Sequence, residues 1–335
     1  MKTIIHQPGS APEDPHLPAE KPGGVRSLVI GGNGGLGYSI TQELLSRGRL
    51  VTSTYHRSNQ ALSTLRGPLL TMSALDVQDE QGLEAVLRGV TNVYFCLNVP
   101  YADWYSVMPE ALERLTSRLG PGQTLVFPGN VYGYGKLQYL PADERHPKAA
   151  LTRKGRLRNR MEEQLVNQSA QRGFRFIIPR YPDYYGPNVT NRLFGAIFSR
   201  ALEARTLLWP VKLDVPRDLV YVGDAARAAV LLAESGETGE WHISGSGAIE
   251  GQLFLHQIQD AAGSPRKCRA LPGWAVRLAG LLDSEARELH ELLYGFEYPL
   301  LLCDSKFMKR FHDYSPTPYK KAIKETIQWF REQQG

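Results

Sequence analysis

Apolar and polar positions alternate along the chain in blocks that predict strands followed by helices. Residues 27–30 form a short apolar run ending at glycines, and Leu36, Ile40 and Leu44 then recur every fourth residue, as on one face of a helix. Strands with apolar residues on both faces, alternating with helices, predict an α/β fold with a doubly wound parallel sheet. The further predicted strands are 50–54, 69–72, 92–97, 123–127 and 174–178, and the helices between most of them are 79–88, 104–118 and about 155–171.

Beyond residue 180 the pattern is less regular. Residues 1–25 are rich in Pro and Gly and lack periodicity, so we expect a flexible N-terminal arm there. We expect a sheet domain at 26–180 and a smaller, mostly helical lobe at 181–335, interleaved with the last strands of the sheet. The helices predicted in that lobe are 191–204, 223–235, 251–262, 272–281, 284–294 and 317–333, with short strands near 219–222 and 240–243.

A glycine-rich loop joins the first predicted strand to the first helix. Gly31, Gly34 and Gly37 have the spacing G-x-x-G-x-x-G, which allows a tight turn, a close approach of the backbone to a diphosphate, and close packing of helix on strand. Exposed amides at the helix N-terminus favour phosphate binding. The sequence therefore predicts a Rossmann-type dinucleotide-binding domain at 26–180. Its predicted cofactor contacts in the loop are Gly31, Asn33, Gly34, Gly35, Leu36 and Gly37.

The end of the second strand bears on the choice of cofactor. A site selective for NAD places an acidic residue about 20 residues beyond the glycines, but residues 54–58 contain no acid. Arg57 could instead pair with a 2′-phosphate. We therefore favour NADP over NAD. Asp76 and Val77 are expected at the adenine edge, and Leu97 and Asn98 beside the nicotinamide half.

With these motifs in place, the chain resembles the extended short-chain dehydrogenase/reductase superfamily, in its NAD-dependent epimerase/dehydratase group. The resemblance spans about residues 26–333 and implies a seven-stranded parallel sheet, a nicotinamide cofactor and a C-terminal lobe that shapes the substrate pocket. Its landmarks are the glycine loop, Asp76-Val77, and the segments 130–133, 180–187, 217–224 and 304–307.

One departure from that family concerns its proton donor, the Tyr of a Y-x-x-x-K pair. In one register Lys154 and Arg158 occupy the two positions of the pair, and in the other Gly155 and Asn159 do; the tyrosine is missing in both. The hydrophobic phasing of Leu165 and Val166, later in the same predicted helix, slightly favours the second register. The chain is thus an atypical member, and the Ser or Thr expected after the fifth strand is also replaced, by the segment 127–130.

Hydride transfer to a carbonyl needs a donor for the developing alkoxide. The candidates are Asn130, Tyr132, Tyr134 and Lys154; Tyr134 is expected to be the more open tyrosine because glycines flank it. Lys154 could instead anchor a ribose or phosphate of the cofactor, and Tyr132 could be a packed structural aromatic. We also place Arg180 in the cofactor site. The candidates for an aromatic substrate pocket are Tyr101, Trp104, Tyr184 and Tyr185.

Composition narrows the setting. The formal charge is +5, without a nucleic-acid recognition motif, so we expect a small-molecule substrate and no nucleic-acid partner. The three cysteines form no ligand cluster, the histidines show no metal-ligand spacing, and no apolar stretch approaches a membrane span. We therefore expect no metal, no membrane insertion and a cytoplasmic protein; a homodimer is expected only by analogy with related folds.

Three functions remain open at this point. The first is an NADP(H)-dependent oxidoreductase, of the carbonyl reductase or dehydrogenase type, acting on a small metabolite or sugar-like carbonyl compound. The second is an epimerase, isomerase or dehydratase that retains its nicotinamide cofactor. The third is a non-catalytic NADP(H)-binding regulatory protein, which the loss of the Tyr/Lys pair would allow.

Overall fold

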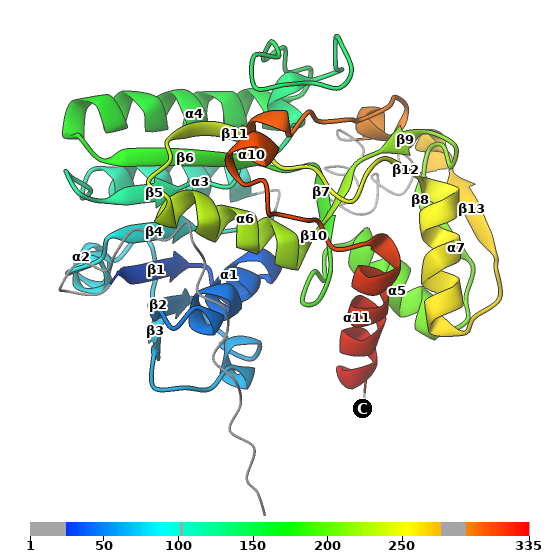
Figure 1. The fold of residues 1–335 in the computed structure, drawn as a ribbon, viewed down its shortest axis with the longest axis horizontal. Coiled ribbons are helices and arrows are strands. Elements are labelled where there is room, and N and C mark those ends of the chain that lie inside the picture. Colours follow the sequence, from blue (N-terminus) through cyan, green and yellow to red (C-terminus); the bar gives the residue numbers. More distant parts are fainter. Residues whose placement is uncertain (1–24, 101–102, 276–292, 335) are drawn as a thin grey trace, which may run out of the picture.

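The computed structural model describes residues 25–100, 103–275 and 293–334. The predicted arm at 1–25 lies outside these ranges except for Val25, as do most of the helices predicted at 272–281 and 284–294. A seven-stranded sheet forms the centre of the fold, in the order β11-β6-β5-β4-β1-β2-β3 with every pair parallel (Figure 1). The strands are β1 (Arg26–Ile30), β2 (Leu50–Tyr55), β3 (Leu70–Ala74), β4 (Asn92–Phe95), β5 (Thr124–Val126), β6 (Arg175–Arg180) and β11 (Gly239–His242).

Helices cover both faces of the sheet because its strands bury side chains on both sides. Val29 belongs to a core cluster with residues of α1 and α6, whereas Leu28 and Ile30 belong to a second cluster with residues of α2, α3 and α4. This confirms the predicted doubly wound α/β fold. The helices are α1 (Gly35–Ser46), α6 (Val222–Glu234), α2 (Glu80–Leu87), α3 (Trp104–Thr116) and α4 (Arg153–Arg172).

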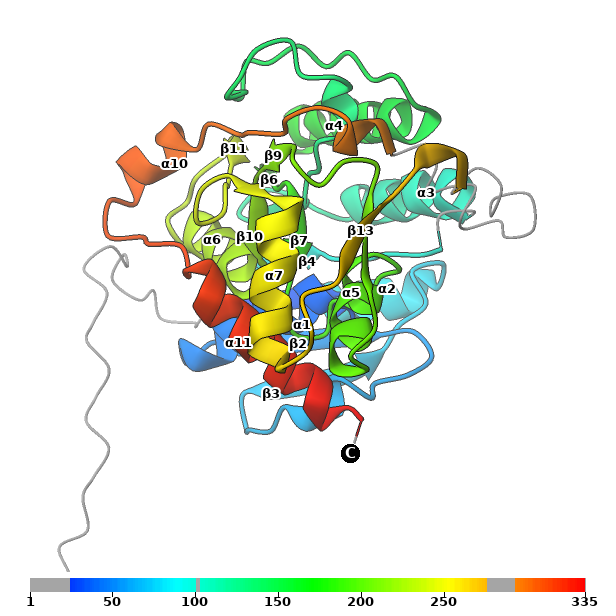
Figure 2. The same cartoon turned by 90° about the vertical axis from the view of Figure 1, so that its right-hand side faces the viewer.

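The second half of the chain builds a lobe at one end of the sheet (Figures 1 and 2). Helices α5 (Phe194–Leu202), α7 (Gly251–Ala262) and α11 (Tyr319–Glu332) pack together beside the parallel pair β8 (Leu207–Pro210) and β13 (Cys268–Leu271). The shorter elements are β7 (Asp183–Tyr185) paired with β10 (Leu219–Tyr221), β9 (Pro216–Arg217) paired with β12 (Ile249–Glu250), the 3-10 helices η1 (Leu62–Thr64), η3 (Tyr132–Tyr134) and η4 (Leu293–Phe296), and α10 (Ser305–Arg310).

The lobe also contributes to the sheet. Strand β11, from residues 239–242, pairs with β6 at the sheet edge, and α6 packs against α1. Sequence periodicity located α5, α6, α7 and α11 but missed β7, β8, β9, β12, β13 and α10, which are too short or too irregular to show a pattern. The boundary at residue 180 stays a prediction, since the chain crosses it to complete the sheet.

Candidate cofactor and substrate site

The glycines of the loop serve different purposes. Gly31 has a φ of +82°, and a Cβ there would lie 2.6 Å from the carbonyl oxygen of Cys96. At Gly37 a Cβ would lie 2.3 Å from the Gly31 oxygen. Gly34, however, has a φ of −82°, and a Cβ there would meet nothing closer than the Gly31 oxygen at 3.6 Å. The fold therefore requires glycine at 31 and 37 but not at 34, where the missing side chain leaves room for a ligand.

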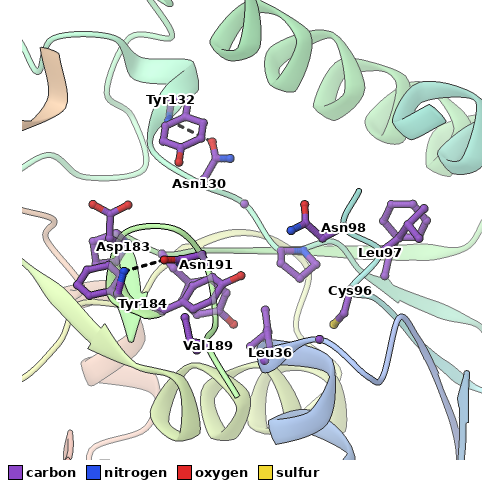
Figure 3. A pocket seen from close by; sticks show the side chains of 18 of the residues that line it. Leu36, Cys96, Leu97, Asn98, Asn130, Tyr132, Asp183, Tyr184, Val189 and Asn191 are labelled. Atoms are coloured by element: carbon purple, nitrogen blue, oxygen red, sulfur yellow. Dashed lines mark hydrogen bonds between the residues drawn. The ribbon is translucent and has the colours of Figure 1, made fainter. Parts of the chain in front are cut away.

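A cavity of about 410 Å³ opens in front of this loop. It lies between the start of α1 and the segments that follow β4, β5 and β6, which is where ligands bind in open α/β sheets (Figure 3). An elongated cofactor lying across it would meet the amides at the N-terminus of α1 at one end. The predicted site residues that line the cavity are Asn33, Gly34, Gly35, Leu36, Leu97, Asn98, Trp104, Asn130, Tyr132 and Tyr184.

Two of these residues, Asn33 and Asn130, also form hydrogen bonds within the protein through their side-chain oxygens. The Asn33 Oδ1 accepts hydrogen bonds from the backbone nitrogens of Ala61 (2.9 Å) and Leu62 (3.3 Å), so this side chain holds the turn after β2. The Asn130 Oδ1 accepts from the backbone nitrogen of Tyr132 at 3.1 Å (Figure 3). This bond leaves the Asn130 Nδ2 to donate to a substrate oxygen.

Other predicted contacts lie away from the cavity. Arg57 and Asp76 are exposed beyond the ends of β2 and β3, and the Asp76 Oδ1 accepts a hydrogen bond from the Gln78 backbone at 2.9 Å. Val77, half-buried, packs against the core between the sheet and α2. Their contact with an adenosine half stays a prediction. Tyr101 lies outside the described residues.

Tyr185 does not face the cavity, contrary to its prediction as a pocket residue. Its side chain is 1% exposed, and its ring lies among those of Phe198, at 6.3 Å between centroids, and Phe254, at 5.0 Å. Strand alternation explains the difference from its neighbour: Tyr184 points to the cavity, so Tyr185 points into the core of the lobe.

Tyr134 is buried rather than open. Its hydroxyl donates to Glu240 Oε1 at 2.6 Å and lies 2.6 Å from the Nε2 of His242. Burial raises the pKa of Tyr134 well above its usual value. The flanking glycines do not expose the ring, because β11 supplies partners from more than 100 residues later in the chain. Tyr134 therefore acts as a structural residue of the loop, and Tyr132 alone of the two lines the cavity.

Arg180, predicted to contact the cofactor, is also wholly buried and does not line the cavity. Its Nε donates to Glu240 Oε1 (2.5 Å), its Nη2 to Glu162 Oε2 (2.8 Å) and its Nη1 to the backbone oxygen of Asn130. Burial by itself would raise the pKa of Glu162, but the charge and hydrogen bond of Arg180, together with the nearby charges of Lys148 and Arg158, outweigh it and hold this pKa below its usual value. Arg180 thus supports the backbone behind Asn130.

Helix α4 corrects the register that phasing favoured. A Cβ on Gly155 would lie 2.3 Å from the backbone oxygen of Tyr132, and Asn159 donates to the backbone oxygen of Gly133 at 3.1 Å, so both face η3. Arg158 lines the cavity instead, which supports the register of Lys154 and Arg158. The phasing misled because it counted Val166 as buried, whereas its side chain is 44% exposed.

Arg158 lines the cavity, although the sequence did not predict it as a cofactor or substrate contact. It is 6% exposed, its Nη2 donates to the backbone oxygen of Pro128, and burial lowers its pKa to about 10. The Arg158 guanidinium therefore remains protonated at neutral pH and places a positive charge at the cavity wall. Lys154 is fully buried and is not among the lining residues, so its role as a proton donor stays a prediction.

A smaller cavity of about 110 Å³ adjoins the first and shares Val131, Tyr132, Asp183, Asn191 and Phe194 with it. We call it the inner cavity. Arg217 lines it and donates through Nη2 to Asp183 Oδ2. Both residues lie in segments that carried the family resemblance, but nothing local in the sequence shows that they meet.

Within the described ranges, no three His, Cys, Asp or Glu residues are placed to hold a metal ion. Over the same ranges no helix combines the length and the apolar character needed to cross a bilayer.

Comparisons with known proteins agree with the fold. The chain is 26% identical to a UDP-N-acetyl-alpha-D-glucosaminuronate decarboxylase of Bacillus cytotoxicus, over 92% of this chain and 98% of the relative. It is 23% identical to a UDP-glucose 4-epimerase of Corynebacterium glutamicum, over 80% and 90%. The structure of a dTDP-glucose 4,6-dehydratase from Bacillus anthracis in complex with NAD superposes with a TM-score of 0.76 at 17% identity, covering 92% of this chain and 97% of that one.

Together, the sheet order and the glycine loop define a Rossmann-type protein of the short-chain dehydrogenase/reductase class. The sequence profile of the NAD-dependent epimerase/dehydratase family matches residues 27–243, and the chain belongs to that family.

Proposed function

We propose that this chain is an enzyme that holds a nicotinamide dinucleotide in the larger cavity and uses it transiently on a hydroxyl-bearing substrate, as an epimerase or dehydratase does. When bound, the cofactor supplies reversible hydride transfer. The observation that carries the proposal is Gly34: the fold does not need glycine there, but a diphosphate against the α1 amides does. The sugar-nucleotide epimerase, dehydratase and decarboxylase relatives favour this function over a simple carbonyl reductase.

The chain's own residues suggest how a substrate is handled. Tyr132 lines both cavities, so its ring lies where a substrate would pass from one to the other. With the Nδ2 of Asn130 it can donate to a substrate oxygen on which charge develops. Arg158 replaces the family's lysine with a fixed cation next to the cofactor.

Retention of the cofactor separates the two enzyme functions. We expect purified protein to carry a nicotinamide dinucleotide that survives extended dialysis, detected by absorbance after denaturation. Protein that is free of cofactor and oxidises added NADPH with a panel of carbonyl compounds would instead favour the reductase. Protein that binds the cofactor but turns over no substrate of either kind would favour the regulatory function.

We further propose that the cofactor is NADP(H). Arg57 is exposed at the end of β2, and residues 54–58 present no carboxylate to the ribose hydroxyls. The NAD complex named above was obtained with a different protein, and Arg57 is the reason to expect NADP here.

Arg57→Ala is expected to weaken NADPH binding by about tenfold, corresponding to about 1.4 kcal/mol, because a charge-assisted contact with the 2′-phosphate is lost. Binding of NADH, which lacks that phosphate, should not change. Cofactor fluorescence titrations of both proteins measure this, with Arg66→Ala, an exposed arginine near the same turn, as the control. Equal losses for NADPH and NADH would show that Arg57 does not select the phosphate.

A further inference from the structure

The inner cavity contains a charged pair at its junction with the cofactor cavity. Its remaining walls are largely apolar, from Val131, Leu137, Leu193, Phe296 and other residues. At about 110 Å³ it is well below the roughly 300–1,000 Å³ of sites that enclose a drug-sized ligand. The inner cavity can therefore hold a small compound, or one end of a larger ligand that extends into the cofactor cavity.

Arg217 is the buried cation of this wall. Its side chain is 2% exposed, and its guanidinium lies 3.8 Å from the ring centre of Phe296. Nη1 donates to the backbone oxygen of Gly295 at 3.3 Å, and the buried Nε has no protein partner. A guanidinium in this position would by itself favour a phosphate or carboxylate in the cavity, since its planar donors match such anions.

The carboxylate of Asp183 removes the preference of the inner cavity for an anion. This carboxylate, 23% exposed, pairs with Arg217. Asp183 lines both cavities, and Figure 3 shows its side chain in the larger one. The pair is neutral as a whole, and an incoming phosphate would face the Asp183 carboxylate within a largely apolar cavity, where like charges repel more strongly than in water. The third charged residue of the lining, Arg192, is exposed to solvent, where its charge is screened.

We propose that the inner cavity excludes the diphosphate of a nucleotide-linked sugar and takes a small, uncharged compound bearing a hydroxyl group, which donates a hydrogen bond to Asp183. This inference rests on the proposed function, which places the nicotinamide cofactor in the adjoining larger cavity. It separates this chain from the relatives whose names specify UDP- and dTDP-linked substrates. The Asp183–Arg217 pair is then a specificity determinant, with the carboxylate as acceptor for the substrate hydroxyl.

The test uses UDP as a probe and needs no knowledge of the substrate. Isothermal titration of the full chain, saturated with NADP so that the cofactor site is filled, should show no saturable UDP binding at about 1 mM, the weak limit of a useful affinity. Asp183→Asn keeps the shape of the side chain and frees the charge of Arg217. We expect its UDP affinity to rise by at least about tenfold, because a UDP phosphate can then pair with the buried guanidinium of Arg217.

Two controls make the result specific. Asp260→Asn changes the net charge equally at an exposed ion pair with Arg266, and should not gain UDP binding. Adding Arg217→Gln to Asp183→Asn should abolish the gain, with thermal melting confirming that the double variant is folded.

Either of two results would overturn the inference: saturable UDP binding by the unaltered, cofactor-loaded protein at or below about 1 mM, or no gain of UDP binding in Asp183→Asn. The cofactor titration is a separate measurement. Failure to bind any nicotinamide dinucleotide would refute the proposed function, whereas UDP binding to the cofactor-loaded protein would refute only the exclusion of diphosphates.

Discussion

Arg180→Met is expected to lower the free energy of unfolding by about 3–5 kcal/mol, the usual cost of removing one partner from a buried ion pair. The substitution leaves Glu162, which is 2% exposed on its side chain, and Glu240 without the guanidinium between them. Lys148 still contacts both carboxylates, at 2.6 and 3.2 Å, but it is partly exposed and compensates only in part. Methionine approximates the volume of the lost side chain, so the loss reports charge rather than a cavity.

The pH dependence identifies the cause. In the unaltered protein burial by itself would raise the pKa values of Glu162 and Glu240, but Arg180, Lys148 and the other polar partners of these carboxylates together outweigh burial and hold both pKa values below their usual values. Their stabilisation is present above the unfolded pKa of about 4.3 and is lost as the pH falls towards the folded values. Without Arg180 burial is opposed by fewer charges, so both pKa values should rise and the variant should gain less stability than the unaltered protein as the pH rises. The deficit should therefore be smaller at pH 5 than at pH 8.

Chemical denaturation at the two pH values measures this effect. Arg175→Met is a matched control, because Arg175 lies on the same strand but is exposed, and its loss should change stability by less than about 0.5 kcal/mol. A deficit under about 1 kcal/mol for Arg180→Met, or one that does not vary with pH, would show that the buried network does not hold the loop of Asn130 and Tyr132.

Gly34→Ala is expected to weaken NADPH binding by at least about tenfold, or 1.4 kcal/mol, while the fold is kept. The methyl group has space in the protein itself, since its nearest neighbour would be 3.6 Å away, but it projects where the diphosphate must approach the backbone. The free energy of unfolding should fall by less than about 1 kcal/mol, the cost of a poorer helix N-cap.

Gly37→Ala is the matched comparison. Its main effect should be on the stability of the unliganded protein, whereas the main effect of Gly34→Ala should be on cofactor affinity. The Cβ at position 37 would lie 2.3 Å from the Gly31 oxygen, so α1 must shift and the protein should lose about 1–3 kcal/mol of stability without any ligand present. Thermal melting and NADPH fluorescence titration of both variants separate the two roles. Unchanged NADPH affinity in a folded Gly34→Ala protein would contradict a diphosphate at the loop.

Much of the fold could be predicted because its signals are local. The apolar runs, the four-residue recurrence of Leu36, Ile40 and Leu44, and the glycine spacing each arise within a dozen residues. In a parallel sheet, ligands bind at the carboxyl ends of the strands, and the predicted site residues Asn98, Asn130 and Tyr132 follow strand ends and line the cavity there. Their roles toward cofactor and substrate stay predictions. Short strands such as β8 and β13 escaped because a run of four residues carries little periodicity.

The charged residues were harder to predict because their roles depend on distant partners. Tyr134 appeared open beside glycines, but Glu240 and His242 close over it from β11. Arg180 was predicted as a cofactor contact, but its guanidinium forms ion pairs with the buried carboxylate of Glu162 and the half-buried carboxylate of Glu240. Asp183 and Arg217 are separated by 34 residues, so their pairing follows from the tertiary fold alone.

The position of strand β11 in the sequence affects folding during synthesis and the stability of truncated fragments. This strand is the last strand of the sheet in sequence, yet it supplies the buried partners of a loop more than 100 residues earlier. During synthesis on the ribosome, the segment at 130–134 can reach its final arrangement only after residue 242 has emerged from the exit tunnel. We therefore expect a fragment ending at residue 180 to aggregate or to be degraded by proteases rather than to form an autonomous cofactor-binding unit.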